Sequence, residues 1–492
     1  MLPTKLAKQI KPTSATKREV RSSYEYVEGW GMTVGGYSRL LHPRSTEDIL
    51  ASYNIAYHDG VGLGLRGSGN SYGDASVNEG GHVLDISEMN RFLDWNPETG
   101  VAEVEPGVTV EQLWKRILAD GWWPKVVPGT MFPTLAGACA ANIHGKNNFA
   151  VGTIGESTLE FDIVLPTNEV RTCSRTQNTD LFYAAIGSFG MLGCFSRLVL
   201  QTKKVHSGDL WVRTVNTRNL REMMDYFELN KSNSDYLVGW VDCFPSDASS
   251  GRGLIHQAHY MRPGEDAHPE KTLSLSHQEL PPNIFGVFPR SEMWRVLQLF
   301  NHDPGMRFIN AVKYFSATFD DMRDRFKQSH ASFAFLLDYV PNWKWAYGRK
   351  PRRFGLIQYQ PFLPDRVAHD VYLDLLSRCR KADLVPYLGV LKRHRSDPFW
   401  LTHAVDGWSF AMDFAVTPSN RNRLWKHCAE MTRVVLEAEG RFYFAKDLVI
   451  GSDDAQRFFP ADKLEAFRHL KRECDPEQLL VNNFTRRVFP ER

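Results

Sequence analysis

The chain carries the stretch RGSGNSYGD from Arg66 to Asp74, directly after a predicted strand at 62–66. Its glycines permit positive φ angles and a close approach of the backbone to a ligand. Successive backbone N–H groups in such a turn form a concave site for an anion, and a pyrophosphate is the natural guest. The spacing matches neither the GxGxxG fingerprint that opens a helix nor the GxxxxGK[ST] loop. An ordinary glycine-rich turn remains the alternative for this stretch alone.

Two further clusters of small residues follow. After the turn PGT at 128–130, the stretch 134–147 reads TLAGACAANIHGKN, and the stretch 187–193 reads GSFGMLG. A tightly packed helix or turn would also explain the second cluster. Each glycine destabilises a regular element by about 0.5–1 kcal/mol, so three clusters in one region favour a long ligand that touches several backbone turns.

The composition is that of a globular protein with more than one domain. The chain has 492 residues, of which 42% are hydrophobic and 24% charged, and a chain of this length usually forms two domains. The net charge of +2 gives no reason to expect a nucleic-acid partner. The seven cysteines are scattered without a CxxC pair, so we expect no metal site and a reducing, cytoplasmic location.

Targeting and membrane-spanning segments are not expected from the hydropathy pattern. No run of about 18 apolar residues is present, which argues against a membrane-spanning helix. The basic and polar residues 1–23 lack the apolar centre of a secretory signal. We expect a solvated tail there, with a targeting or membrane-surface role as the alternative.

Short strands and one well-marked helix are predicted in the first 205 residues. Strands are expected at 62–66, 82–86 and 101–106. Thr109 and Gln112 form a capping-box pattern at the start of a helix that ends at Gly121. Strands interleaved with such a helix indicate an α+β or α/β domain.

A second pattern appears late in the chain. The predicted elements are a strand at 354–362, a helix from Pro364, strands at 386–393 and 408–416, a helix at 420–440, and a strand at 441–447. This order is β-α-β-β-α-β, which predicts an antiparallel sheet with helices on one face.

These motifs, in this order and spacing, resemble the PCMH-type FAD-binding domain of the vanillyl-alcohol oxidase superfamily. The similarity is greater still to the decaprenylphosphoryl-β-D-ribose 2′-oxidase family, which carries an RGxGxSYGD loop, an HGKN tetrad, a QYQ strand and an AKD strand end. The corresponding stretches here are 66–74, 144–147, 358–360 and 445–447. The stretches 475–476 and 483–487 are also similar, whereas the region from about 205 to 330 matches loosely.

The resemblance implies an α+β fold with two domains. An FAD-binding domain at 1–205 is followed by a substrate domain with an antiparallel sheet at 206–440, and residues 441–492 return to the FAD-binding domain. Many relatives bond the flavin covalently to a histidine in the first loop, where this chain has Asn70 and Ser71, so non-covalent FAD is expected. The residues expected along FAD are Arg66, Gly67, Ser68, Gly69, Asn70, Ser71, Tyr72, Gly73, Gly129, Thr130, Gly137, Asn142, His144, Gly145 and Gly193.

The resemblance also assigns side chains to the reaction. Lys446 corresponds to the essential lysine of the family and would stabilise the negative charge that develops during hydride transfer. His144 and Tyr72 are the other candidate catalytic residues. The candidate substrate-binding residues are Lys392, Gln358, Gln360 and Tyr339.

Each assignment has an ordinary structural alternative. Lys446 alone would fit a surface salt bridge, and His144 a structural histidine. Gln358 and Gln360 lie two residues apart on a strand and therefore point to one face, either toward sugar hydroxyls or toward solvent.

The expected activity is the FAD-dependent oxidation of a secondary hydroxyl on a polyprenyl-phosphoryl ribose, giving a 2′-keto product that a short-chain reductase partner would complete. An alditol or aldonolactone oxidase that reduces oxygen to hydrogen peroxide is the first alternative, and a non-catalytic carbohydrate-binding protein is the second. The basic run at 349–353, preceded by Trp343 and Trp345, is either a solvated loop or a collar for a polyprenyl-phosphate head group at a membrane surface.

Overall fold

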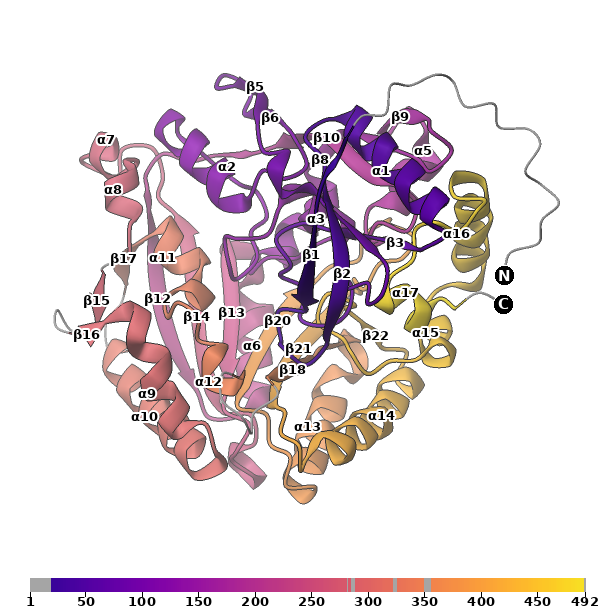
Figure 1. Cartoon of the computed structure of the whole chain (residues 1–492). Coiled ribbons are helices and arrows are strands. Elements are labelled where there is room, and N and C mark those ends of the chain that lie inside the picture. The colour runs from indigo at the N-terminus through magenta and orange to yellow at the C-terminus, as the bar shows by residue number, and fades with distance from the viewer. Residues whose placement is uncertain (1–18, 281, 285–287, 322–324, 349–354, 491–492) are drawn as a thin grey trace.

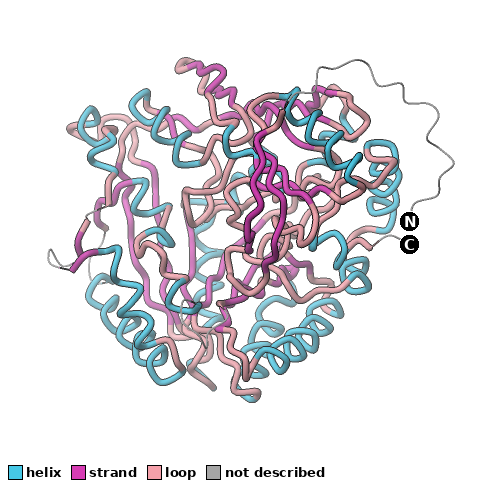
Figure 2. Tube along the Cα trace, viewed as in Figure 1, coloured by secondary structure: helices cyan, strands magenta, loops and turns pink. Residues whose placement is uncertain are grey.

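The computed structural model describes residues 19–280, 282–284, 288–321, 325–348 and 355–490. Residues up to 201 form a four-stranded and a five-stranded sheet, and residues from 209 onward form a nine-stranded sheet (Figure 1). Most helices lie at the periphery and most strands lie inside (Figure 2). The mixture of helices with largely antiparallel sheets confirms the predicted α+β class. The basic run at 349–353 lies outside the described residues.

The four-stranded sheet leads into the first glycine-rich loop. Its order is β1 (Arg21–Glu28), β2 (Gly35–His42), β4 (His82–Asp85) and β3 (Leu63–Arg66). Strand β4 runs parallel to β2 and β3, because α1 (Thr46–Asp59) returns the chain between β2 and β3. The predicted strands at 62–66 and 82–86 are thus confirmed as β3 and β4, and the loop begins where β3 ends.

The five-stranded sheet is antiparallel, and a capped helix follows its second strand. The order is β5 (Phe92–Asn96), β6 (Val101–Val104), β10 (Cys194–Gln201), β8 (Thr158–Val164) and β9 (Val170–Ser174). Helix α2 (Val110–Ile117) begins with the predicted capping box, in which the Gln112 N–H donates to Thr109 Oγ1 at 3.1 Å and the Thr109 N–H donates to Gln112 Oε1 at 2.8 Å. Gly121, at φ 77°, ends the helical segment as predicted.

Several short elements complete this part of the chain. They are β7 (Trp122–Trp123), α3 (Leu135–Ala140), α4 (Asn148–Val151), α5 (Thr179–Ala185) and β11 (Lys203–Lys204). Strands β7 and β11 pair with each other.

The nine-stranded sheet is antiparallel throughout and provides one wall of the site described below. Its strands are, in order, β17 (Phe326–Ser329), β12 (Asp209–Thr217), β14 (Gly253–Tyr260), β13 (Tyr236–Val241), β20 (Leu388–His394), β21 (Gly407–Ala415), β19 (Pro361–Pro364) and β22 (Arg441–Phe442), and β18 (Leu356–Tyr359) also pairs with β21.

The predicted β-α-β-β-α-β order is present as β19, α13 (Asp365–Lys381), β20, β21, α14 (Arg421–Glu437) and β22. The predicted single strand before α13 is instead two strands, β18 and β19, separated at Gln360, because Pro361 has no N–H for the ladder. The predicted last strand ends at Phe442. The Lys446 and Asp447 N–H groups both donate to the Tyr443 carbonyl, so these residues form a turn.

Helices cover both faces of the nine-stranded sheet, and none was predicted between residues 206 and 340. A Cβ added to Gly239 of β13 would meet the Met223 sulfur of α6 (Leu220–Asn230) at 2.5 Å. The next residue, Trp240, packs instead with Ala317 of α10 (Asp303–Asp321). Neighbouring residues of a strand point to opposite faces, so α6 and α10 lie on opposite sides of the sheet.

Smaller elements connect these strands and helices: α7 (Pro269–Thr272), α8 (Leu275–Gln278), the hairpin of β15 (Asn283–Ile284) and β16 (Phe288–Pro289), α9 (Met293–Phe300), α11 (His330–Ala334) and α12 (Trp345–Gly348). Helix α9 packs beside α10 and α12 (Figure 1).

The C-terminal segment lies against the first part of the chain. The Leu63 N–H donates to the Leu479 carbonyl at 2.8 Å, and the Val481 N–H donates to the Leu63 carbonyl at 3.1 Å. Arg487 forms ion pairs of 2.8 Å with both Asp74 and Asp447. The three helices α15 (Ser452–Phe458), α16 (Ala461–Cys474) and α17 (Asn483–Val488) accordingly lie on the same side of the molecule as α1 (Figure 1).

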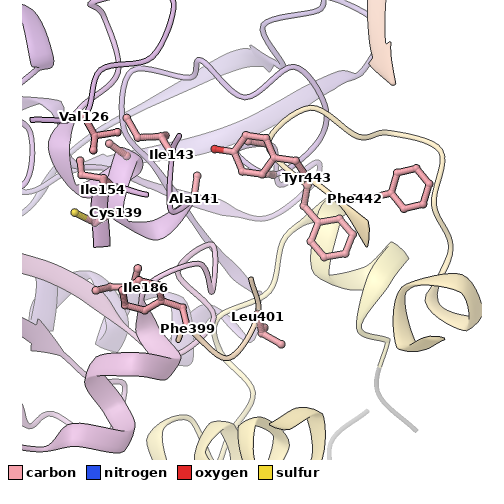
Figure 3. Close-up of a cluster of buried hydrophobic side chains, with 14 of the residues drawn as sticks. Val126, Cys139, Ala141, Ile143, Ile154, Ile186, Phe399, Leu401, Phe442 and Tyr443 are labelled. Atoms are coloured by element: carbon pink, nitrogen blue, oxygen red, sulfur yellow. The ribbon is translucent and has the colours of Figure 1, made fainter. Parts of the chain in front are cut away.

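A continuous hydrophobic core joins segments that are distant in sequence. Figure 3 shows Ile143 and Ala141 in one cluster with Phe399, Leu401 and Tyr443. All seven cysteines are buried and unpaired. Within the described residues, no helix has the length and apolar character needed to cross a membrane.

Candidate functional site

A cavity of about 860 Å³ lies between the glycine-rich segments and the nine-stranded sheet. Its volume is in the upper part of the range, about 300–1,000 Å³, that is typical of small-molecule sites. All three glycine-rich clusters contribute to its lining, and strands β13, β14, β18, β20 and β21 contribute from the sheet. The structure therefore brings the sequence motifs together around one space.

The loop after β3 presents unsatisfied backbone donors to this cavity. Within the part of the chain that the structure describes, the N–H groups of Ser68, Gly69, Asn70 and Ser71 have no hydrogen-bond acceptor. Gly69 has φ 68°, and a Cβ on Gly67 would lie 2.1 Å from Thr134 Oγ1. Four successive free N–H groups in a loop that excludes side chains suit the binding of an anion.

Small residues form the wall next to this loop. Helix α3 begins at Thr134, whose hydroxyl oxygen accepts a hydrogen bond from the Gly137 N–H at 3.2 Å. The residues of this segment that line the cavity are Ala136, Gly137, Ala138, Ala140 and Ala141. Because none has a side chain beyond Cβ, a large flat group can lie against the backbone.

The turn at 128–131 is held in place by the side chain of Asp338. Thr130 Oγ1 donates to Asp338 Oδ1 at 2.7 Å, and the Met131 N–H donates to Asp338 Oδ2 at 2.8 Å. Burial raises the pKa of Asp338 to about 6, although both hydrogen bonds oppose this shift. The free N–H groups of residues 68–71 fit the diphosphate of FAD, and the wall of small residues at 136–141 fits its ring system.

Lys446 lies deep in the cavity beside Tyr72. Its Nζ atom is 3.7 Å from the centroid of the Tyr72 ring. The Tyr72 N–H donates to the Ala445 carbonyl at 2.8 Å, which fixes the glycine-rich loop to the turn that carries Lys446. Burial lowers the pKa of Lys446, and the nearby Asp413 carboxylate opposes that shift.

Asp413 was not among the residues predicted from sequence. It is buried on β21, and its Oδ1 atom accepts a hydrogen bond from Gln358 Nε2. Burial raises the pKa of Asp413, and the Gln358 hydrogen bond and the Lys446 charge both oppose this. The three side chains therefore form one buried polar group at the cavity wall.

His144 and Gln360 belong to a second buried polar group. Gln360 Nε2 lies 3.2 Å from His144 Nε2 and 3.3 Å from Ser409 Oγ, and Ser409 Oγ lies 2.7 Å from His394 Nε2. Burial lowers the pKa of His144 and of His394 well below the usual value, so both rings are neutral. The hydrogen bonds hold the His144 ring in place at the cavity, and its part in binding or catalysis stays a prediction.

Four residues expected at the ligand do not line the cavity. Gly73 packs against the Asp447 carbonyl, Gly145 packs against Asn147, and Asn142 donates to Asp397 Oδ2 at 3.0 Å. Tyr339 is 42% exposed. The first three shape the backbone around the cavity, and contact of any of the four with a ligand stays a prediction.

All other predicted site residues line the cavity, and they are Arg66, Gly67, Ser68, Gly69, Asn70, Ser71, Tyr72, Gly129, Thr130, Gly137, His144, Gly193, Gln358, Gln360, Lys392 and Lys446. Lys146, His256 and Lys313 also line it and were not predicted as site residues. Lys146 lies in the HGKN tetrad, but its Nζ donates to the Phe333 and Ala334 carbonyls. His256 and Lys313 lie in the region where no sequence motif was present.

The comparisons with known proteins agree with this geometry. Residues 37–174 match the family described as FAD binding domain. Over 476 residues, which are 94% of this chain and 96% of the relative, the chain is 25% identical to a decaprenylphosphoryl-beta-D-ribose oxidase of Mycolicibacterium smegmatis.

Two other relatives match a smaller share of the chain. Cytokinin dehydrogenase 5 of Arabidopsis thaliana is 30% identical over 186 residues, covering 36% of this chain and 34% of that protein. A probable mitochondrial D-lactate dehydrogenase of Danio rerio is 27% identical over 224 residues, covering 38% and 43% respectively. The protein is therefore an FAD-dependent oxidoreductase with a PCMH-type FAD-binding domain.

Proposed function

We propose that this oxidoreductase acts on CH–OH groups and converts the 2′-hydroxyl of a polyprenyl-phosphoryl ribose to a ketone. The similarity to a decaprenylphosphoryl-ribose oxidase over 94% of the chain supports this substrate class. The observation that carries the proposal is the group of Lys446, Tyr72 and Gln358 in one cavity with His144 and Gln360. The amide and imidazole groups in this cavity can donate hydrogen bonds to the hydroxyls of a sugar and accept hydrogen bonds from them.

Bound FAD supplies the acceptor for the hydride that leaves the hydroxyl-bearing carbon. The chain itself has to take the hydroxyl proton, and Lys446 is suited to this because burial lowers its pKa toward neutrality. Once it holds that proton, the Lys446 ammonium is favourably paired with the Asp413 carboxylate. We thus assign Lys446 a role in proton transfer as well as in stabilising the developing negative charge.

The polar side chains around Lys446 orient the sugar. Tyr72 keeps its phenolic proton, because burial raises its pKa well above the usual value, and its hydroxyl has no partner within the described residues. It is therefore available to donate to the substrate. Gln358 is held by Asp413, and Gln360 is held by Ser409 and His144, so both amides are fixed before a sugar binds.

The remaining assignments form part of the same proposal. We propose an FAD-binding part at 1–205, a substrate part at 206–440 and a C-terminal return at 441–492, with FAD bound non-covalently along the residues named above. Completion of the reaction by a short-chain reductase and contact with a membrane surface are further expectations of this substrate class.

An anaerobic titration tests the proposal. Purified holoprotein is mixed without oxygen with a short-chain prenyl-phosphoryl ribose, and the flavin absorbance near its visible maximum is followed. Loss of that absorbance supports the proposal. Loss with free alditols or aldonolactones alone would replace it with the alternative of a carbohydrate oxidase that reduces oxygen.

A further inference from the structure

We propose that Lys313, His256 and Lys392 form a subsite for the phosphate group of the substrate, on the face of the nine-stranded sheet that α10 covers. This inference rests on the proposed function, and it names the part of the cavity that recognises the phosphate. The ligand chemistry is a phosphate mono- or diester, which a prenyl-phosphoryl sugar and a free phosphate share.

The three side chains come from different elements and face the same space. In the sheet register, His256 of β14 pairs with Val238 of β13, and β13 pairs in turn with β20, which carries Lys392. The backbones of β14 and β20 are thus separated by two strand spacings, or about 10 Å. Lys313 reaches the same cavity from α10, and all three residues line it.

Among the described residues, none of the three has an anionic partner. Lys313 Nζ lies 4.5 Å from the Trp240 ring centroid, and within the described residues neither Lys313 nor Lys392 forms an ion pair or a side-chain hydrogen bond. Thr214 Oγ1 lies 3.5 Å from His256 Nδ1, and Nε2 has no partner among the described residues. Three side chains that can donate hydrogen bonds are thereby left for a ligand.

Asp338 is the one carboxylate among the described cavity-lining residues, and it already accepts hydrogen bonds from Thr130 and Met131. Burial lowers the pKa of Lys392 to about 8, and no carboxylate opposes that shift. His256 is neutral because burial, together with Lys313 and Lys146, lowers its pKa to about 3.

A phosphate satisfies this arrangement better than a neutral sugar does. Its non-bridging oxygens accept several hydrogen bonds at once, and charge-assisted bonds to lysine are roughly twice as strong as neutral ones. The neutral His256 ring adds a donor without adding a charge to the two lysines. A sugar hydroxyl would leave both ammonium groups without a counter-charge in a partly desolvated space.

The test compares a substrate that carries the prenyl-phosphoryl group with one in which a methyl group replaces it. A short-chain prenyl-phosphoryl ribose and methyl β-D-ribofuranoside are given to the wild-type holoprotein and to Lys313→Met, Lys313→Arg and Lys327→Met. Lys327 is the matched control, because it also lies over a tryptophan ring, that of Trp211, but does not line the cavity. Flavin content and thermal unfolding establish that each variant is folded and loaded.

The expected result is specific to the phosphate. Lys313→Met raises KM for the phosphorylated substrate by about 10-fold or more, with little change in kcat and none in kcat/KM for the methyl riboside. Lys313→Arg recovers part of the loss, and Lys327→Met behaves as the wild type. Equal losses for both substrates, or no loss for either, would overturn the subsite.

Calorimetric titration of the holoproteins with a short prenyl phosphate and with inorganic phosphate gives a readout that does not depend on turnover. Weaker binding of prenyl phosphate to Lys313→Met than to wild type supports the subsite, even if neither ribose compound is oxidised and the proposed function fails. Equal binding to both proteins contradicts it. If inorganic phosphate shows the same Lys313 dependence, the subsite recognises the phosphate and not the lipid.

Discussion

Lys446 is the residue on which the proposed chemistry depends most directly. Its Nζ atom lies over the Tyr72 ring, inside the cavity and near the buried Asp413. The sequence pointed to Lys446 through the AKD motif alone. Nothing in that motif indicated Asp413, because an aspartate in an apolar strand gives no sign of its partner until the sheet places β21 beside β18.

Replacing Lys446 by methionine removes the charge and the amine while keeping a similar length. Lys446→Met is expected to retain FAD and to slow reduction by substrate about 10²–10³-fold or more. Lys463→Met provides a matched control, because Lys463 of α16 also places its Nζ atom over an aromatic ring, that of Trp400. Stopped-flow measurement of flavin reduction without oxygen checks this, and an unchanged rate would remove Lys446 from the mechanism.

The pH dependence of reduction follows from the Lys446–Asp413 pair. Lys446 must be neutral to take the hydroxyl proton, so the rate falls as the pH drops below its pKa. The Asp413 carboxylate raises that pKa relative to burial alone. Asp413→Asn therefore moves the acid limb of the rate profile to lower pH, by about one unit.

The control for this shift is Asp374→Asn, since Asp374 pairs with Arg378 on the solvent side of α13. Its profile is expected to coincide with that of the wild type. A shift of the Asp413→Asn limb to higher pH would mean that protonated Lys446 is the active form.

At the level of helices and strands, the sequence predicted those features that are stabilised by hydrogen bonds between residues close together in the chain. The capping box of α2 and the glycine stop at Gly121 are examples, because their hydrogen bonds join residues close in sequence. The β-α-β-β-α-β order was also predicted from periodicity. The predicted extension of β22 to residue 447 was wrong, since the turn at Tyr443–Asp447 is fixed by its contact with Tyr72 and Gly73, far away in sequence.

The first glycine-rich loop permits a direct test at this scale. A Cβ on Gly67 would lie 2.1 Å from Thr134 Oγ1 and would displace the start of α3. Gly67→Ala is expected to weaken FAD binding at least about 10-fold and to reduce stability by about 1–3 kcal/mol. Gly451→Ala is the control, because a Cβ there meets nothing within 4 Å. Flavin fluorescence on dilution measures the affinity, and equal retention in both variants would contradict the close packing.

At the level of the whole molecule, the site exists only because distant segments meet. The Gly31 N–H donates to the Tyr72 carbonyl, and the Gly31 carbonyl accepts from the Leu356 N–H, which joins the first loop to β18. The region from 206 to 340 has no recognisable motif, yet its β14 supplies His256 and its α10 supplies Lys313. Such residues are found only when the sheet register and the packing of α10 are known.

Arg487 ties the C-terminal segment to the site by its ion pairs with Asp74 and Asp447. Both carboxylates are buried, so removal of the cation leaves two buried negative charges without their cationic partner. Arg487→Met is expected to destabilise the protein by about 3–5 kcal/mol and to loosen FAD, because Asp74 and Asp447 border the loop and the Lys446 turn. Arg472→Met, at an exposed pair with Glu465, is the control. Chemical denaturation with flavin release measures both effects, and a loss below 1 kcal/mol would contradict this role.

The activity proposed for this FAD-dependent oxidoreductase is oxidation of the ribose of a prenyl-phosphoryl sugar. The most direct measurement is the anaerobic change of the flavin spectrum of the holoprotein on addition of a short-chain prenyl-phosphoryl ribose, followed by mass analysis of the sugar product. We expect loss of the visible flavin absorbance and a product lighter by two hydrogens at the ribose. An unchanged spectrum with this compound, together with loss of absorbance on addition of a free alditol or lactone, would contradict it.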